Sequence, residues 1–119
     1  MNWNYKDLLV WKKSIQLTID VYEITNKFPN KENFNLVSQI NRAVVSIPSN
    51  IAEWNWRNNS KEVNQFLYIS KWSCNEVDTQ LYISKELWYI DDKNYNKIKL
   101  EIEEILKMLS WLIKSNNNR

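Results

Sequence analysis

The sequence contains no glycine and no histidine, one cysteine and two prolines. Without histidine, the chain lacks the commonest general base and the commonest ligand of transition metals. The single Cys74 excludes an internal disulfide and argues against a cysteine-based metal site. A glycine-rich phosphate loop cannot be built from a chain without glycine. These absences predict that the protein is not an enzyme and has no catalytic residue, metal site or cofactor.

Long apolar runs are also missing. No stretch approaches the roughly 20 apolar residues that cross a bilayer, and the first residues lack the basic-then-apolar pattern of a signal peptide. We therefore expect a cytoplasmic protein without a membrane partner. A content of 44% hydrophobic and 25% charged residues is typical of a globular chain, and 119 residues suit one domain, residues 1–119.

Four stretches show apolar residues at spacings of three and four, the pattern of an amphipathic helix. The first covers residues 7–27 and has two apolar stripes: Leu8, Trp11, Ile15, Ile19 and Tyr22, beside Val10, Leu17, Val21, Ile24 and Phe28. The second covers residues 34–53 and contains Pro48. Because proline removes a backbone hydrogen bond and clashes with the preceding turn, we expect a kink or break near residues 44–47. A turn should follow over residues 54–59.

The third stretch opens with a possible capping box, Asn59 with Glu62, and runs to about Leu87. Its heptad pattern is Val63, Leu67, Ser70, Cys74, Val77, Leu81 and Ser84. Asp91 and Asp92 then mark a loop and the start of a fourth helix. That helix carries Tyr95, Ile98, Ile102, Ile105, Leu109 and Leu112, and residues 116–119 should fray. Four helices with short connections predict an all-α, antiparallel up-down-up-down four-helix bundle, its second helix kinked at Pro48.

Candidate polar sites are few. The carboxylate pairs Asp91–Asp92 and Glu103–Glu104 are better explained as a helix start and as solvated surface. Ser46, Ser49 and Asn50 around Pro48 could form a polar site or could satisfy backbone groups that the proline leaves free, and the second interpretation is favoured. We expect Cys74 to pack as a small apolar residue.

Basic residues give the one indication of a partner. The formal charge is +2, with +3 over residues 1–75 and −1 over the remainder. A phosphate-binding surface could therefore form, especially if several subunits combine their charges, although an ordinary solvated surface explains the same residues. The candidate residues for nucleic-acid binding are Lys12, Lys13, Arg42, Arg57, Lys61 and Lys71.

Several segments resemble the four-helix-bundle proteins encoded in intervening sequences of large-subunit ribosomal RNA genes. The segments are residues 5–14, 38–53, 65–70, 76–81 and 87–90, and the string Ser46-Ile47-Pro48-Ser49-Asn50 is unusual inside a helix. The resemblance implies a bundle that assembles as a ring, a pentamer. It extends to the accessory variability protein of diversity-generating retroelements, which has a similar fold and binds a reverse transcriptase and nucleic acid through basic surfaces.

Two departures from the family pattern stand out. The family has a second basic residue where this chain has Asn41, which weakens a nucleic-acid role borrowed from that surface. The second departure concerns glycine, which makes up about 7% of average proteins, so roughly eight would be expected. The family pattern has glycine at five positions where this chain has tryptophan, whereas Trp11 matches a family tryptophan. The five positions are Trp54, Trp56, Trp72, Trp88 and Trp111.

One hypothesis is that the gene uses UGA for glycine and that UGA has been translated here as tryptophan. Abundant Asn, Lys and Ile, which AT-rich coding favours, agree with it. Real aromatic residues in a core or interface are the alternative.

Three functions stay open at this point. The favoured one is a non-enzymatic homo-oligomeric scaffold that binds RNA, DNA or a nucleic-acid enzyme such as a reverse transcriptase. The second is a structural or protein-interaction module without a nucleic-acid role. The third, an enzyme, is disfavoured by the missing residue types.

Overall fold

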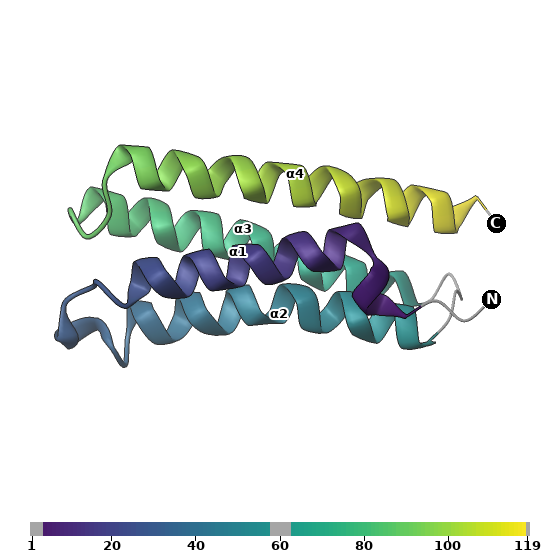
Figure 1. The fold of residues 1–119 in the computed structure, drawn as a ribbon, viewed down its shortest axis with the longest axis horizontal. Helices are drawn as coiled ribbons and strands as arrows, with labels where there is room; N and C mark the ends of the chain where they lie inside the picture. The colour runs from purple at the N-terminus through teal and green to yellow at the C-terminus, as the bar shows by residue number, and fades with distance from the viewer. Residues whose placement is uncertain (1–3, 58–62, 119) are drawn as a thin grey trace.

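The computed structural model describes residues 4–57 and 63–118, and these contain helices and no strand. The four long helices are α1 (Leu9–Thr25), α2 (Leu36–Arg57), α3 (Asn64–Glu86) and α4 (Asp92–Asn117). The 3₁₀ turn η1 (Tyr5–Asp7) precedes α1, and η2 (Asn30–Glu32) lies between α1 and α2. Consecutive helices run in opposite directions along the molecule (Figure 1). The predicted antiparallel four-helix bundle is confirmed.

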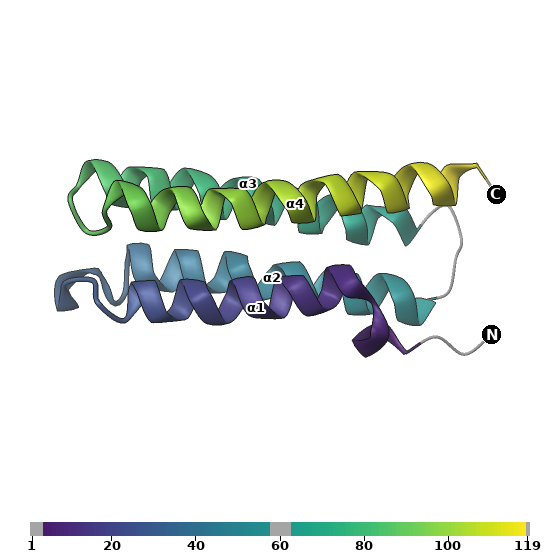
Figure 2. The same cartoon turned by 45° about the horizontal axis from the view of Figure 1, so that its top comes forward.

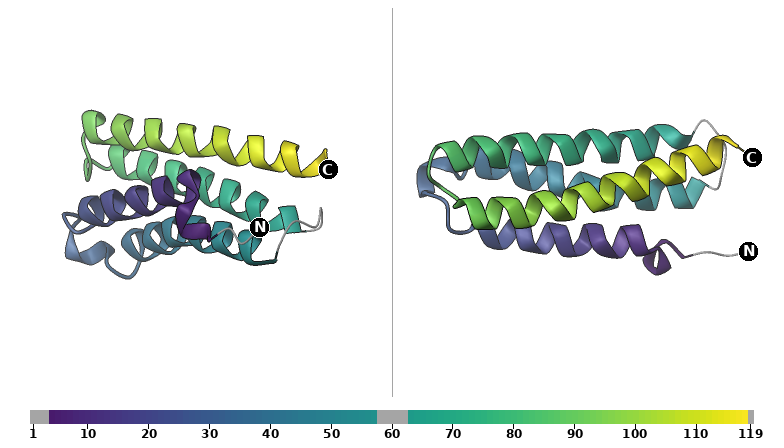
Figure 3. Two further views of the ribbon diagram at one scale, coloured as in Figure 1. Left: turned by 45° about the vertical axis from the view of Figure 1, so that its right-hand side comes forward. Right: turned by 90° about the horizontal axis from the view of Figure 1, so that it is seen from above.

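The helices form two layers around one core. Each helix packs against the next in sequence, and α4 closes the bundle by packing against α1. Seen from the side, the α1–α2 pair and the α3–α4 pair are separate layers (Figure 2). All four helices follow the long axis of a molecule measuring 46 × 22 × 22 Å (Figure 3). Side chains along the bundle axis are therefore the ones withdrawn from water.

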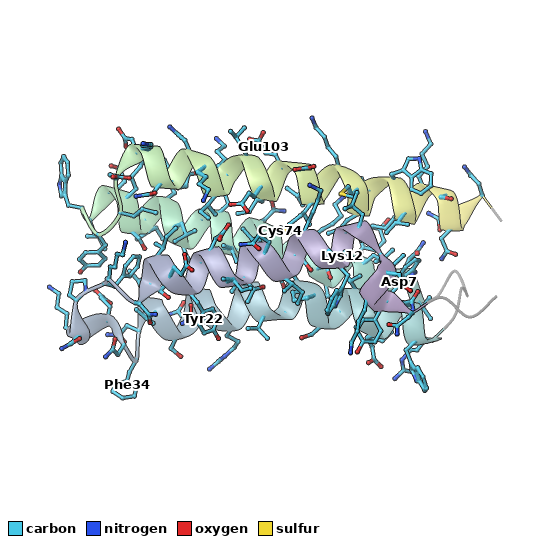
Figure 4. All side chains as sticks on the ribbon, viewed as in Figure 1. Asp7, Lys12, Tyr22, Phe34, Cys74 and Glu103 are labelled. Carbon is cyan, nitrogen blue, oxygen red and sulfur yellow. The ribbon has the colours of Figure 1, made fainter. Side chains whose placement is uncertain are left out.

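The cores of α3 and α4 follow the predicted heptad pattern. The buried members on α3 are Leu67, Ser70, Cys74, Val77, Leu81 and Ser84, and those on α4 are Tyr95, Ile98, Ile102, Ile105 and Leu109. Val63 and Leu112 are only partly buried, and Ile113 is buried next to Leu112. Cys74 lies inside the bundle, as Figure 4 shows, and burial raises the pKa of its thiol to about 12. Cys74 therefore stays protonated and packs as a small apolar residue.

Helix α1 buries its second apolar stripe and exposes part of its first. Val10, Leu17 and Val21 are at most 3% exposed, whereas Ile19 is 46% and Tyr22 is 40% exposed. The buried face was hard to identify in the sequence because two of its members are polar. Ser14 and Thr25 are buried there. Ser14 Oγ donates to the Trp11 carbonyl at 2.7 Å, and Thr25 Oγ1 donates to Asn41 Oδ1 of α2 at 3.0 Å, with the Tyr22 carbonyl farther away at 3.3 Å.

Helix α2 continues through Pro48, so of the predicted kink or break the break does not occur, and the kink at Pro48 stays a prediction. Proline has no N–H to donate, which leaves the Val44 carbonyl without its helical partner. Thr18 of α1 lies beside this carbonyl, with Oγ1 at 3.4 Å from the oxygen. One turn later, Ser49 Oγ donates to the Val45 carbonyl at 2.8 Å.

Other side chains around Pro48 complete this backbone hydrogen bonding. Asn50 Nδ2 donates to the Ser46 carbonyl at 2.8 Å, and Ser70 Oγ of α3 donates to the Ile47 carbonyl at 2.9 Å. Ser49 and Asn50 thus bond backbone carbonyls next to the proline, as the favoured interpretation predicts, whereas Ser46 Oγ accepts from the side chains of Asn50 and Ser73. The neighbouring helix α3 also takes part, through Ser70.

Two helix ends differ from the sequence prediction. Residues 54–57 were expected to turn but continue α2, because Trp54 is buried one turn after Ile51 and Glu53 pairs with Arg57 at 2.9 Å. Asn116 was expected to fray but is buried in α4, where its Nδ2 donates to Asn64 Oδ1 at 2.8 Å. The Asp91 cap is confirmed, since its Oδ1 accepts from the Asn94 N–H at 2.8 Å. The expected capping box of Asn59 and Glu62 lies outside the described residues.

Candidate nucleic-acid interface

The six candidate basic residues do not form one cluster. Lys61 lies outside the described residues, and the others are spread over α1 (Lys12, Lys13), α2 (Arg42, Arg57) and α3 (Lys71). Arg42 and Arg57 are separated by about 22 Å along α2, given a helical rise of about 1.5 Å per residue. A single phosphate group cannot contact both.

Two of these residues are already paired within the chain. Lys13 Nζ lies 2.8 Å from Glu104 of α4, and Arg57 is held by Glu53 and lies over the Phe66 ring at 5.3 Å. Lys12 and Arg42 are exposed on the outer surfaces of α1 and α2, and Figure 4 shows the position of Lys12. Lys12, Lys13, Arg42 and Arg57 are therefore dispersed over the surface. Lys71 differs, because a second lysine lies near it.

Lys71 lines an open groove of about 380 Å³ between the first turns of α3 and the last turns of α4. A second cation, Lys114, lines it from α4. The described residues that line it are Tyr68, Lys71, Ser110, Ile113, Lys114, Asn117 and Asn118, and none of these carries a side-chain carboxylate. The Lys71 Nζ lies 6.0 Å from the centroid of the Tyr68 ring. The groove thus combines two cations, an aromatic ring and two amide side chains.

Buried amide hydrogen bonds hold the two sides of the groove together. Asn64, the first residue of α3, donates from Nδ2 to Asn117 Oδ1 at 2.9 Å. Its Oδ1 accepts from Asn116 Nδ2 at 2.8 Å. These bonds fix the start of α3 against the end of α4, so Lys71 and Lys114 flank the same groove.

Sequence reasoning included Lys71 but missed Lys114 and Tyr68. A signal existed: in an antiparallel pair of helices, a residue near the start of α3 must lie near one at the end of α4. Because residues 116–119 were predicted to fray, the sequence prediction placed no site at that end of the bundle. Ammonium groups can bind phosphate oxygens, and a tyrosine ring can stack on a base, so the lining suits a single-stranded nucleic acid.

The structure also joins two carboxyl groups that sequence reasoning missed. Glu101 of α4 faces Asp20 of α1 with its Oε2 buried, and because two ionised carboxylates cannot hydrogen-bond to each other, a bond between them requires a proton. Burial and the hydrogen bond to Asp20 raise the pKa of Glu101 from 4.5 to about 7. The two residues are far apart in sequence and fall on different helices, so no spacing rule could reveal the pair. A protonated Glu101 can donate to Asp20, which joins α1 to α4.

Asp20 also lines a smaller hollow of about 260 Å³, between α1 and the start of α4. The charged residues in that lining are of mixed sign: Asp20, Glu23, Lys27, Asp91 and Lys97. No group of three or more His, Cys, Asp or Glu residues that could hold a metal ion occurs in residues 4–57 and 63–118. This hollow lacks the cationic character of the α3–α4 groove.

Comparison with known protein families shows which family the chain belongs to. The profile of the 23S rRNA-intervening sequence protein family matches residues 6–111, which extend from η1 to the last third of α4. The chain belongs to this family. Lys71 and Tyr68 lie within the matched residues, whereas Lys114 lies beyond them.

A solved structure agrees with this membership of the 23S rRNA-intervening sequence protein family. It is a protein of unknown function from the S23 ribosomal protein family of Bacteroides thetaiotaomicron, and it superposes with a TM-score of 0.81. The two chains share 26% sequence identity over 89% of this chain and 99% of the other. No curated protein matches the sequence. Among the described helices of this family member, none is both long and apolar enough to span a membrane.

The Asp20–Glu101 pair gives a testable pH dependence. The folded protein holds a proton on Glu101 up to about pH 7, whereas an unfolded chain releases it near 4.5, so stability is lost as pH rises between these values. Replacing Glu101 by glutamine should remove that loss. We expect E101Q to raise the free energy of unfolding at about pH 8 by about 1 kcal/mol, a value reduced for solvent screening.

Urea unfolding of both proteins at several pH values checks this result. The matched control is Glu103→Gln, which removes an exposed carboxylate from the same helix. An E101Q variant whose stability falls between pH 5 and 7 as steeply as that of the wild type would show that this pair does not titrate in the folded state.

Proposed function

We propose that this family member is a non-enzymatic homo-oligomeric scaffold that binds single-stranded RNA or DNA through the α3–α4 groove. The observation that carries the proposal is the lining of that groove, in which Lys71 and Lys114 accompany Tyr68 and the described lining residues include no Asp or Glu. Phosphates would bind the ammonium groups, a base would stack on the Tyr68 ring, and the amide of Asn117 would contact base edges. Such contacts depend little on sequence.

Oligomerisation is supported by apolar side chains that the bundle leaves outside. On α1, Ile19 is 46%, Tyr22 is 40% and Leu9 is 58% exposed, and Ile19 and Tyr22 belong to a regular helical stripe. Contiguous exposed apolar surface is typical of a contact with another protein. The family resemblance implies a second copy and a pentameric ring. In a ring the grooves are repeated, so a chain of formal charge +2 would present several of them to one nucleic acid.

Charge reversal in the groove tests the proposal. In the double variant K71E/K114E, binding of a fluorescently labelled single-stranded RNA should weaken at least about tenfold at low salt, because two phosphate contacts become repulsive. The slope of log K against log salt should become shallower by about 1.4, which is about 0.7 for each phosphate contact on a single strand. Fluorescence anisotropy measures both quantities.

The matched control is K99E/K107E, which makes the same change in net charge at two exposed positions of α4 outside the groove lining. It should bind within about threefold of the wild type if local contacts dominate over total charge. Equal losses in the two double variants would contradict a specific groove. Absence of binding by an assembled wild-type ring at low salt would favour the alternative function, a structural or protein-interaction module without a nucleic-acid role.

A protein partner such as a reverse transcriptase is the second form of this proposal. The groove would then hold nucleic acid beside the enzyme, while exposed apolar residues would contact the enzyme itself. Co-purification from cells that express both proteins should survive nuclease treatment in that case. Loss of the complex on nuclease treatment would leave direct nucleic-acid binding as the explanation.

A further inference from the structure

Trp88 adopts a backbone conformation that suits glycine. It is the one residue among those described with a positive φ, 67°. The left-handed region is accessible to glycine without penalty, because glycine has no Cβ, whereas a bulky side chain there costs conformational energy. A tryptophan at this position therefore needs an explanation.

The conformation is imposed by the end of α3. The Tyr89 N–H donates to the Ser84 carbonyl at 2.9 Å, and the Trp88 N–H donates to the Lys85 carbonyl at 3.0 Å. These two bonds are the Schellman arrangement, in which the residue at the Trp88 position is left-handed and is usually glycine. The helix end and the following turn thus require the positive φ.

Contacts on the far side of the turn hold it in place. The Tyr89 ring packs on Phe28 with 5.4 Å between centroids, and its hydroxyl donates to Glu32 Oε2 at 2.8 Å. Ile90 is buried in the core. Trp88 itself is 93% exposed, so its indole gains almost nothing from burial that would offset the strained backbone.

The other tryptophans are of three kinds, apart from Trp3, which lies outside the described residues. Trp11 packs on the core cluster and contacts Tyr5 edge to face, with 5.4 Å between ring centroids, which is ordinary for a real tryptophan. Three others are largely in water: Trp56 at 80%, Trp72 at 62% and Trp111 at 67% exposed. Trp54 is buried, but its indole N–H has no hydrogen-bond partner among the described residues. Buried indole N–H groups usually have one.

We propose that the gene uses UGA as a glycine codon and that the native protein carries glycine at positions 54, 56, 72, 88 and 111. The proposal explains three observations together: a chain with seven tryptophans and no glycine, a left-handed tryptophan in a glycine position, and four largely exposed indoles at positions 56, 72, 88 and 111. It is independent of the proposed function. It also removes the Trp72 ring that stacks on Tyr68, with 6.3 Å between ring centroids.

Tandem mass spectrometry of the protein from its native cells tests the assignment directly. Peptides that cover the five positions should have the masses of the glycine forms, and the peptide that covers Trp11 should have the mass of the tryptophan form. The gene should show the same division, with UGA at the five positions and UGG at position 11. Tryptophan in the native peptide at position 88 would overturn the proposal.

Recombinant protein tests the structural reason for it. The variant W88G should raise the folding equilibrium constant about fivefold or more, because it removes the strain of a bulky residue at positive φ. The variant W88A is the matched control, since alanine keeps the Cβ and should recover little of that gain. Urea unfolding measures both. A W88G variant no more stable than W88A would show that the turn does not require glycine.

Discussion

Replacing Ile102 by aspartate should abolish the folded bundle. Ile102 is 1% exposed at the middle of α4, and the core around it offers no cation to pair with a carboxylate. Burying an unpaired charge costs several kcal/mol at least, which approaches the total stability of about 5–15 kcal/mol that small domains have. Far-UV circular dichroism should show the loss of most of the helical signal.

Leu100 provides the matched control for this substitution. It lies two residues away on the same helix and is 67% exposed. Leu100→Asp should leave the spectrum unchanged and alter stability by less than about 0.5 kcal/mol. A chain that tolerates both substitutions equally well would show that α4 does not bury the face carrying Ile102.

The second large effect is expected at Ser70, at the interface between α3 and α2. Ser70 is fully buried, and its hydroxyl donates to the Ile47 carbonyl beside Pro48. S70L should lower the free energy of unfolding by about 3 kcal/mol or more, because it adds volume to a packed contact and removes a hydrogen bond. S70A removes only the hydrogen bond, so it should cost about 1 kcal/mol.

Urea unfolding of S70L and S70A distinguishes the two contributions. If packing limits how closely α2 and α3 approach, the free energy of unfolding of S70L is lower than that of S70A by about 2 kcal/mol. An S70L variant at least as stable as S70A would show that the contact between α2 and α3 accommodates a larger side chain. The small residues on α3 would then not set the distance between the two helices.

The sequence predicted α3 and α4 well because hydrophobic periodicity alone decides which of their faces is buried. Ile98, Ile102 and Ile105 are nearly the whole signal on α4, and all three are in the core. On α1 the same rule was insufficient. Both stripes of α1 are apolar, and the buried one includes Ser14, whose hydroxyl is satisfied by its own helix.

Pro48 shows a different limit of sequence reasoning. A proline inside a helix predicts a disrupted backbone, yet α2 continues, and Ser70 of α3 donates to the Ile47 carbonyl beside the proline. That bond depends on how α3 packs against α2. Local sequence therefore predicts the hydrogen bond lost at Pro48 but not the contacts between helices beside it.

The candidate site was only partly predictable for the same reason. Positive charge identified Lys71, but the groove also needs Lys114, which is brought close by the antiparallel pairing of α3 and α4. The amide hydrogen bonds from Asn64 that fix this pairing join residues about 50 positions apart. Charge counting could not separate Lys71 from Arg57, which is paired with Glu53.

Light scattering of the purified protein tests assembly and nucleic-acid binding in one measurement. The molar mass at low salt should correspond to about five chains, as the family resemblance implies, and it should rise by the mass of bound RNA when a single-stranded oligonucleotide is added. A monomeric mass that does not change on addition of RNA would contradict the proposed scaffold.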